Sequence, residues 1–423
     1  MKWVKGIFYV LFLGVCMAIG AGGRLFMNVV ESVGGKGASP IKFIETMTNP
    51  RGEFPGKNKI TILLVGQDYN RDRKGMPYTK NSRADTIMLL AVDLDKKAVR
   101  ACSIPRDTYV QAADQLTGKI NATLSRGGVD LLKRTLEQQF GLTIDNYVLV
   151  KPYAIRKIVD AVGGVQVEAL DDMKYDDSWG QLHVDIPKGR HHLAGIQAEG
   201  FVRFRKMNPG EGRSEEEGDL RRAARQQQVV RSMMMAATKT SNLLRADEII
   251  DTGFEQIDTD LQRQQCVALA QIFRNADMSK MLSGTVPGTD EMNGPEYVYR
   301  LDYDRAQHTV NWLIKGDDLA MKRLVRVQIR NGTKTKGVAR IAADILESQG
   351  YSAFAPGNAP ATNVTTIVYS KASFEQAARD IQRALGASSV TKEAKPSNDW
   401  EPEIEIVIGD DVASRIKPAT DPT

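Results

Sequence analysis

The chain has 423 residues, of which 42% are hydrophobic and 26% are charged, and its formal net charge is +5. A chain of this length can form two or three domains that each bury a hydrophobic core, and the small net charge does not point to nucleic acid as a partner. Its three cysteines and four histidines show no disulfide framework and no spacing typical of a metal site, which excludes proteins built on either.

A membrane anchor is predicted at the N-terminus. Lys2 and Lys5 precede an uncharged apolar segment at residues 6–23, which is about as long as the shortest helix that crosses a bilayer. Because positively charged flanks stay on the cytoplasmic side, we expect residues 1–30 to form a cytoplasmic tip and a transmembrane signal anchor. The rest of the chain would then lie outside the membrane.

The alternative for this segment is a signal peptide that is removed, since the small residues at 18–21 form an acceptable cleavage site. Residues 31–57 follow and are rich in Gly, Pro and Lys without sustained periodicity. They are expected to form a stalk between the membrane and the first folded domain.

Three apolar runs, at residues 60–65, 86–94 and 98–103, predict three neighbouring strands of a buried sheet. The short turn at 93–97 indicates that the second strand is antiparallel to the third, and we expect the same relation to the first. Helix-like and strand-like stretches then alternate over residues 127–169, which favours a layered α/β domain.

Charged residues stand where these strands begin or end. Asp68 follows the first strand, Arg83 and Asp85 precede the second, and Arg106 and Asp107 follow the third. Antiparallel neighbours would bring all five side chains to one edge of the sheet. Carboxylates among arginines suit a divalent cation beside a phosphate, because Mg²⁺ takes one or two carboxylates and fills its other sites with water and phosphate oxygens. The alternative is a surface ion pair between Arg83 and Asp85.

A second basic group lies farther along the chain. The stretch FVRFRK at 201–206 alternates apolar and basic residues, so on a strand Arg203 and Arg205 would point to the same face. A helix is predicted from Asp219, on which Arg222 and Gln226 share a face because they are four residues apart. The alternative for this helix is a solvated basic surface over an apolar side.

The motifs LLVGQD, SRADTIMLL, CSIPRDT, KIN, LAGIQAEGFVRFR and GDLRRAARQQ follow one another behind a single apolar segment. In this series the chain resembles the LytR-CpsA-Psr family of bacterial cell-wall proteins over residues 58–317. The resemblance implies a layered α/β/α catalytic domain with a central mixed sheet. Residues 322–412 resemble the smaller α/β LytR C-terminal domain, and residues 413–423 form a tail. In that smaller domain we expect the order strand, helix, strand, helix, strand and a role in binding the cell wall or a partner.

The resemblance implies an extracytoplasmic phosphotransferase that moves a glycopolymer such as teichoic acid from a polyprenyl pyrophosphate carrier to a hydroxyl of peptidoglycan, forming a phosphodiester bond. Its partners would be the lipid-linked polymer, peptidoglycan and membrane lipid, without nucleic acid. The enzyme would be held in the cell membrane by a single span. A cation and several arginines would stabilise the charge that develops on the leaving phosphate.

Site residues follow from the same resemblance. The family's metal-binding aspartates fall on Asp68 and Asp85, which would hold Mg²⁺ or Mn²⁺. Asp107 is the candidate base, with Arg106 beside it as the second catalytic residue. The residues implied to bind pyrophosphate are Arg83, Arg106, Lys119, Arg203, Arg205, Arg222 and Gln226. The apolar faces of helices expected at 131–140 and 154–162 could line a cavity for the lipid tail, although core packing explains them equally well.

Two other classes of function stay open. A binding protein or a pyrophosphatase that holds the lipid carrier without transferring glycan would use the same residues. A membrane-bound transcriptional attenuator is the third possibility, but no helix-turn-helix signal is evident and the charge rule places the arginines outside the membrane.

Overall fold

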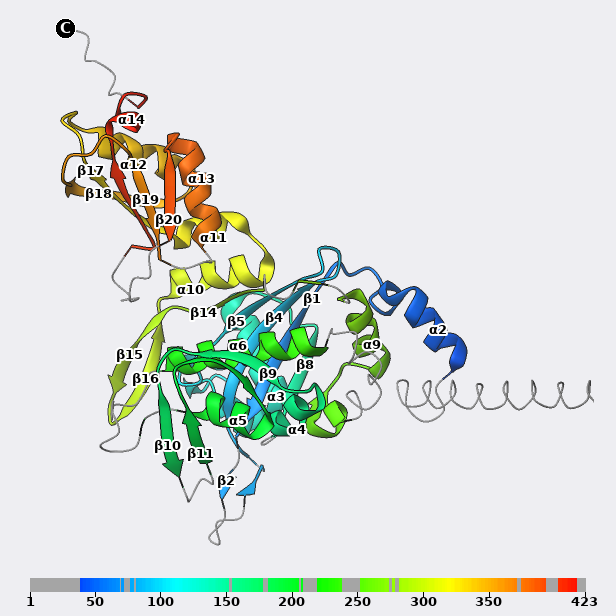
Figure 1. Ribbon diagram of the computed structural model, residues 1–423. Helices are drawn as coiled ribbons and strands as arrows, with labels where there is room; N and C mark the ends of the chain where they lie inside the picture. The colour runs from blue at the N-terminus through cyan, green and yellow to red at the C-terminus, as the bar shows by residue number, and fades with distance from the viewer. Residues whose placement is uncertain are drawn as a thin grey trace, which may run out of the picture. The chain divides into compact units, whose positions relative to one another are not determined.

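The computed structural model describes the chain in segments, which are residues 39–68, 70–71, 77–79, 81–151, 154–177, 182–204, 207, 219–237, 252–273, 276–277, 281–370, 374–392 and 402–416. The predicted anchor at 1–30 lies outside the described residues. Within those segments, no helix is both long and apolar enough to cross a membrane. The chain divides into two compact units, Met1–Leu301 and Asp302–Thr423 (Figure 1).

A six-stranded mixed sheet is the centre of the first unit. Its strands lie in the order β13-β8-β1-β4-β5-β14. Strand β4 is antiparallel to both β1 and β5, as predicted, whereas β8 is parallel to β1 and β14 is parallel to β5. The bounds are β1 Lys59–Gln67, β4 Ala84–Asp93, β5 Ala98–Ser103, β8 Asn146–Val150, β13 Ile257–Thr259 and β14 Leu282–Thr285. The predicted α/β class with a central mixed sheet is confirmed.

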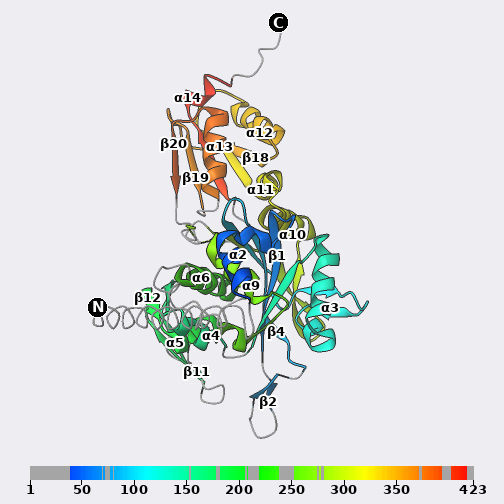
Figure 2. The same cartoon turned by 90° about the vertical axis from the view of Figure 1, so that its right-hand side faces the viewer.

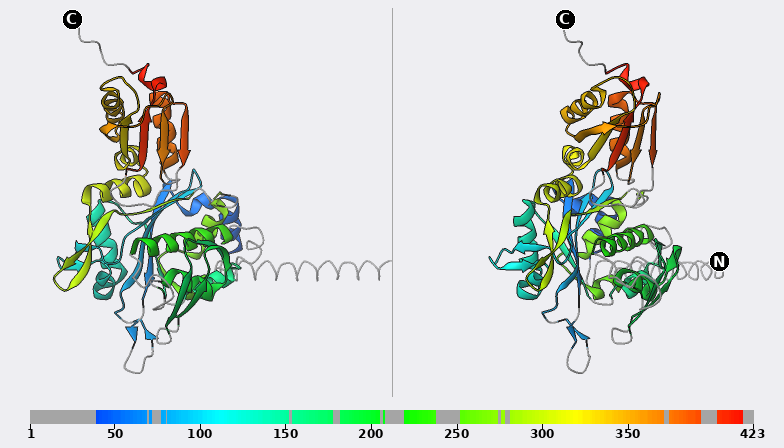
Figure 3. Two further views of the ribbon diagram at one scale, coloured as in Figure 1. Left: turned by 60° about the vertical axis from the view of Figure 1, so that its left-hand side comes forward. Right: turned by 90° about the vertical axis from the view of Figure 1, so that its left-hand side faces the viewer.

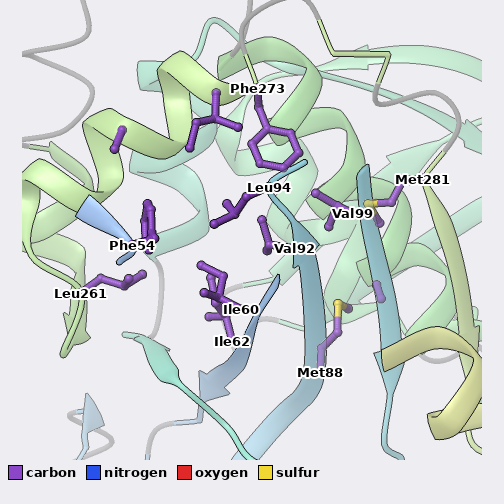
Figure 4. Packing of buried hydrophobic residues seen from close by; sticks show 13 residues of the cluster. Phe54, Ile60, Ile62, Met88, Val92, Leu94, Val99, Leu261, Phe273 and Met281 are labelled. Atoms are coloured by element: carbon purple, nitrogen blue, oxygen red, sulfur yellow. The ribbon is translucent and has the colours of Figure 1, made fainter. Parts of the chain in front are cut away.

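Both faces of this sheet are covered by helices, which explains why its strands are continuous apolar runs. Helix α3 (Ala122–Phe140) and the helices α4 to α6 lie on opposite sides of β1 and β4 (Figures 2 and 3). On the α6 side, Ile60, Ile62 and Met88 pack with residues of α9 (Arg263–Ile272) in one hydrophobic cluster (Figure 4). Along β1, Ile60, Ile62 and Leu64 pack in this cluster, whereas Leu63 and Val65 are buried outside it, as expected when successive side chains point to opposite faces.

Helix α3 starts earlier than the sequence pattern indicates. The helix-like stretch begins at residue 127, but the structure extends the helix to Ala122 with a break at Gly127 and Gly128, whose dihedral angles are not helical. Gly141 ends α3 in the left-handed conformation, with φ 57°, which glycine adopts without steric cost.

A second layer of the first unit holds α4 (Ala154–Ala161), α5 (Gly195–Arg203) and α6 (Asp219–Ala237). Two short antiparallel sheets complete it, β9 (Val165–Ala169) with β12 (Gly189–Leu193) and β10 (Met173–Asp177) with β11 (Leu182–Ile186). Their inward-facing residues form one apolar cluster with α4, α5 and α6.

The strand expected at FVRFRK is wrong, because Arg203 is the last residue of helix α5. Phe201 and Phe204 are both buried and three residues apart, which is the spacing of one helix face. The Gln197 side chain accepts a hydrogen bond of 3.1 Å from the backbone N–H of Ala194 and closes the first turn. The alternation of apolar and basic residues therefore did not indicate a strand here, since residues 201–203 form the last turn of α5.

The remaining elements of the first unit are short. Strands β6 and β7 and strands β15 and β16 form antiparallel pairs, and Tyr299 of β16 forms a single parallel bridge to Thr108. The bounds are α2 Pro40–Thr48, η1 Pro50–Glu53, β2 Asn70–Arg71, β3 Pro77–Tyr78, β6 Tyr109–Gln111, β7 Thr117–Lys119, β15 Gly288–Asn293 and β16 Glu296–Leu301.

The second unit contains a five-stranded sheet in the order β18-β17-β21-β19-β20. Its strands are β17 Arg326–Asn331, β18 Ser352–Asn358, β19 Thr366–Tyr369, β20 Ser389–Lys392 and β21 Ile404–Ile408. Its helices are α10 Tyr303–Val310, η3 Asn311–Lys315, α11 Asp318–Leu324, α12 Val338–Ser348, α13 Glu375–Leu385 and α14 Asp410–Ala413. The expected order of three strands and two helices is incomplete, because β18 and β20 were missed. Both are edge strands, and β18 contains Pro356 and Gly357, which weaken the strand pattern.

Candidate active site

The ends of β1 and β4 place four of the predicted residues together. The backbone N–H of Asp68 donates a hydrogen bond of 2.9 Å to the carbonyl oxygen of Arg83. Arg106 Nη1 donates a hydrogen bond of 2.6 Å to Asp85 Oδ1 and forms an ion pair with it. This edge of the sheet therefore presents two carboxylates and a guanidinium that come from three adjacent strands.

A cavity of about 180 Å³ opens beside this edge. One part of its wall is polar and includes Asp68, Asp85, Glu199, Arg203 and Gln226. The rest is mainly apolar, with side chains from α4, α5 and α6, namely Ile155, Ile158, Val202, Val229, Val230 and Met233. The cavity can hold a ligand that has a charged part and an apolar part.

Two helices were expected to line a cavity for the lipid tail, and the residues of the apolar wall show which of them does so. The helix predicted at 154–162 contributes Ile155 and Ile158 to the wall. The stretch 131–140 lies in α3, on the other side of the sheet, where Leu131, Leu132 and Leu136 are buried. For that stretch the alternative of core packing is the correct one.

Asp68 and Asp85 both line the cavity, which suits the pair of carboxylates expected to hold a divalent cation. Within the described segments, no group of three or more His, Cys, Asp or Glu residues could hold a metal. Mg²⁺ does not require such a group, because it commonly keeps several waters and binds one or two carboxylates together with substrate phosphates. The residues at this edge therefore fit Mg²⁺ or Mn²⁺ with a phosphate bound beside it.

The side chain of Arg203, which lines the cavity, is held by the buried carboxylate of Glu199. Glu199 lines the cavity and is 2% exposed, and its Oε1 accepts a hydrogen bond of 2.6 Å from Arg203 Nη1. Its second oxygen accepts a hydrogen bond from Arg156 Nε of α4. Sequence reasoning missed both Glu199 and Arg156. The spacing of four residues between Glu199 and Arg203 on a helix was the available signal.

Helix α6 supplies Gln226 to the cavity, whereas Arg222 is buried and does not line it. Neighbouring polar residues of this helix have structural contacts. Arg225 Nη2 donates a hydrogen bond of 2.6 Å to the carbonyl oxygen of Phe204, and Gln227 Nε2 donates one of 2.8 Å to that of Gly284. The helix thus combines one polar residue of the cavity wall with other polar residues that fix α6 to the fold.

Asp107 and Lys119, like Arg106, do not line the cavity, and Arg106 connects Asp107 to its edge through the contact with Asp85. The Asp107 carboxylate is 3.5 Å from Lys119 Nζ, 3.3 Å from Asn121 Nδ2 and 3.8 Å from Arg106 Nε. Arg106 therefore lies between two carboxylates, those of Asp85 and Asp107. This row of alternating charges extends the site from the cavity toward the β6–β7 hairpin.

Two of the predicted residues remain, Arg83 and Arg205. Arg83 is exposed, and no ion pair joins it to another residue in the described segments. Arg205, which was expected to share a face with Arg203, lies outside the described residues.

Neither cysteine of the described segments is a thiolate nucleophile. Burial raises the pKa of Cys102 to about 12. Burial also raises the pKa of Cys266 to about 11, against an opposing effect of the Arg263 charge. Both thiols stay protonated at neutral pH, so a covalent cysteine intermediate is not supported.

Comparison with known proteins identifies relatives of both units. The model of the LytR_cpsA_psr family matches residues 38–315, and that of the LytR cell envelope-related transcriptional attenuator matches residues 324–411. The polyisoprenyl-teichoic acid--peptidoglycan teichoic acid transferase TagV of Bacillus subtilis (strain 168) is 28% identical over 311 residues, which cover 72% of this chain and 75% of TagV. The transferase of that title named TagU, from Bacillus anthracis, is 29% identical over 277 residues, covering 64% of this chain and 82% of TagU. The crystal structure of B. subtilis TagV superposes with a TM-score of 0.52 and 26% identity, over 61% of this chain and 98% of that one.

Proposed function

Because the chain belongs to the LytR_cpsA_psr family, we propose that it is an extracytoplasmic phosphotransferase of cell-wall assembly. It moves a glycopolymer from a polyprenyl pyrophosphate carrier to a hydroxyl of peptidoglycan and forms a phosphodiester bond. The relatives TagV and TagU are, by name, transferases of teichoic acid from a polyisoprenyl carrier to peptidoglycan. The sequence resemblance and the comparisons agree on this class of enzyme.

The cavity is the observation that carries the proposal. A polyprenyl pyrophosphate has a multiply charged head and a long apolar tail, and the cavity joins a polar wall to an apolar one. The polar wall suits the pyrophosphate, because Arg203 donates to anionic oxygens and a cation held by Asp68 and Asp85 would neutralise others. The apolar wall from α4, α5 and α6 suits the first isoprene units of the tail.

The transfer step needs the two substrates to meet at the sheet edge. The hydroxyl oxygen of the acceptor forms a bond to the phosphorus that carries the glycan, while the bond from that phosphorus to the second phosphate breaks. Polyprenyl phosphate leaves with the electron pair. Arg106 and Arg203 stabilise the charge on the phosphate oxygens, and their positions are fixed before the substrate binds by hydrogen bonds to Asp85 and Glu199.

We assign Asp107 as the base that accepts the proton of the acceptor hydroxyl. Its carboxylate lies 3.5 Å from Lys119 Nζ, 3.3 Å from Asn121 Nδ2 and 3.8 Å from Arg106 Nε, which hold it beside the arginine of the site. Phosphoryl transfer does not require a strong base, because the transition state is loose and positioning and electrostatics supply most of the catalysis.

The location outside the cytoplasm rests on the N-terminal segment. Residues 6–23 are apolar and follow two lysines, so we assign residues 1–30 to a signal anchor with a cytoplasmic N-terminus. The second unit, matched by a domain of the same class of cell-envelope protein, is assigned to binding of the wall or of a partner protein.

The test is a reconstituted transfer reaction. The purified full-length chain in detergent receives a lipid-pyrophosphate glycan with a labelled sugar, peptidoglycan fragments and Mg²⁺. We expect a labelled product joined to peptidoglycan by a phosphodiester bond. Release of free glycan phosphate without any joined product would identify a pyrophosphatase instead, and binding without turnover would identify a carrier protein.

A further inference from the structure

A buried carboxylate lies between two arginines at the wall of the cavity. Glu199 is 2% exposed, and each of its oxygens accepts a hydrogen bond from a different guanidinium, that of Arg203 and that of Arg156. Arg203 lines the cavity, whereas Arg156 stands behind Glu199 on α4 and does not line it. The three groups form a row in the order Arg156, Glu199, Arg203.

Burial of a lone carboxylate is costly, and pairing with a single arginine would cancel the charge of that arginine. If only Arg203 faced Glu199, the pair would be neutral and would attract a pyrophosphate weakly. With Arg156 as a second partner, the three side chains together carry a formal charge of +1. The row can therefore hold the Arg203 guanidinium in one orientation and still offer positive charge to the cavity.

Backbone contacts between α4 and α5 fix the positions of Arg156 and Glu199 relative to each other. A Cβ atom placed on Gly195, at the start of α5, would lie only 2.1 Å from the carbonyl oxygen of Arg156, so α4 and α5 pack in direct backbone contact. The backbone N–H of Gly195 also donates a hydrogen bond of 2.8 Å to Asp160 Oδ1 of α4. Glu199 follows one turn later on α5, which sets its distance from Arg156.

We propose that Glu199 is a positioning residue for pyrophosphate binding and that Arg156 is the counter-charge that lets it act. Glu199 orients Arg203 toward the pyrophosphate of the lipid carrier, and Arg156 neutralises Glu199 so that Arg203 keeps its attraction for the anion. This inference rests on the proposed function, since it concerns the same ligand in the same cavity.

The proposal predicts an unusual order of affinities. Arg156→Gln leaves Glu199 paired with Arg203 alone, and this pair is neutral, so pyrophosphate binding weakens by about tenfold, the effect of losing one charged hydrogen-bond partner. The double variant Arg156→Gln with Glu199→Gln also removes the opposing carboxylate. It therefore binds pyrophosphate more tightly than Arg156→Gln alone, although less tightly than the unmodified protein, because Arg203 has lost its orientation.

The experiment measures binding of farnesyl pyrophosphate and of inorganic pyrophosphate to the full-length chain by calorimetry, with Mg²⁺ present. The matched control is Arg126→Gln, because Arg126 also pairs with a carboxylate, that of Asp114, and its side chain is about as exposed as that of Arg156, 29% against 34%. We expect the control to bind like the unmodified protein. Unfolding temperatures show whether each variant is folded. If the variant that contains Glu199→Gln is unstable, the affinity of Arg156→Gln alone still tests the proposal.

Two results would overturn the inference. One is unchanged affinity of Arg156→Gln for both ligands, and the other is a double variant that binds no more tightly than Arg156→Gln alone. If the unmodified protein binds neither ligand, the proposed function fails and the inference fails with it. Binding by the unmodified protein together with unaffected variants would overturn the inference only.

Discussion

Arg106 Nη1 donates a hydrogen bond of 2.6 Å to Asp85 Oδ1, which joins the loop after β5 to the start of the neighbouring strand β4. The two side chains are only 21% and 28% exposed, so the pair is partly withdrawn from water. A guanidinium held in this way needs little reorganisation when a phosphate binds beside it. The same contact sets the direction of the Asp85 carboxylate in the cavity wall.

Removal of either partner should abolish transfer. We expect Asp85→Ala and Arg106→Ala to lower the rate of glycan transfer by at least about a hundredfold, because each removes charge stabilisation at the reacting phosphate. The free energy of unfolding should change by about 1 kcal/mol or less, since the pair is partly solvated. Transfer assays and thermal unfolding measure the two effects, with Asp114→Ala, which breaks an ion pair outside the cavity, as the control. A large loss of stability with full activity would mean that the pair is structural.

We expect the apolar wall of the cavity to bind the lipid tail of the substrate and not its pyrophosphate group. Ile158 lines the cavity from α4, and Ile158→Asn places an amide where the tail would lie. We expect affinity for farnesyl pyrophosphate to fall by about tenfold, since burial of an aliphatic side chain against a ligand contributes about 1.5 kcal/mol. Affinity for inorganic pyrophosphate should not change. Ile41→Asn, at a site 78% exposed on α2, is the control. Equal losses for both ligands would show that the wall does not bind the tail.

The variant Asp107→Asn tests whether Asp107 accepts the hydroxyl proton or only holds Arg106 and Lys119 in place. If Asp107 accepts the hydroxyl proton, kcat falls by about a hundredfold while KM for the lipid substrate stays the same. This is the outcome we expect, because the amide keeps the shape of the side chain and its place beside Lys119 and Asn121. A rise in KM with unchanged kcat would instead make Asp107 an anchor for Arg106 and Lys119.

Local patterns were sufficient to predict the centre of the first unit. The apolar runs gave β1, β4 and β5 with their antiparallel relation, and charges at the strand ends gave the edge where Asp68, Asp85 and Arg106 meet. These features are decided within a few residues of one another. They depend on burial of both sheet faces, which a sequence displays directly.

The predictions from sequence were wrong or incomplete where contacts between distant parts of the chain determine the structure. FVRFR alternates like a strand, but Phe201 and Phe204 pack in one cluster, and residues 201–203 are the end of helix α5. Arg156 and Glu199 are 43 residues apart in the chain, and only the packing of α4 on α5 brings them together. No pattern within either helix indicates which arginine a buried glutamate will find.

Gly195→Ala should separate these helices. The added Cβ would overlap the backbone of Arg156, so α5 must shift, and we expect a loss of about 1–3 kcal/mol in the free energy of unfolding. The shift should also weaken binding of farnesyl pyrophosphate, because Glu199 moves away from Arg156. Gly253→Ala is the control, since a Cβ at Gly253 meets no atom within 4 Å. Urea unfolding and calorimetry measure both effects, and a fully stable Gly195→Ala variant with normal binding would contradict the close packing of α4 and α5.

The second unit should lose stability in acid through Asp411. Burial acts to raise the pKa of this carboxyl, but hydrogen bonds from Thr365, Ser388 and the backbone N–H of Val412 outweigh it and hold the pKa below the ordinary value of 3.8. A carboxyl whose pKa is lower in the folded state stabilises the fold above its unfolded pKa. That contribution is lost as the pH falls through the folded pKa.

Asp411→Ala removes these contacts at every pH. Thr365 is fully buried, so its N–H and hydroxyl would lose their acceptor, and we expect a cost of about 1–3 kcal/mol at pH 7. Amide hydrogen exchange in β19 reports this cost, with Asp410→Ala as the control, because the neighbouring Asp410 is exposed. The difference between Asp411→Ala and the unmodified protein should shrink as the pH falls below about 4, because the carboxyl of the unfolded chain protonates there first and that of the folded chain only at its lower pKa. A difference that stays constant down to pH 2 would show that the charge of Asp411 does not contribute, and that its hydrogen bonds act equally well in the protonated form.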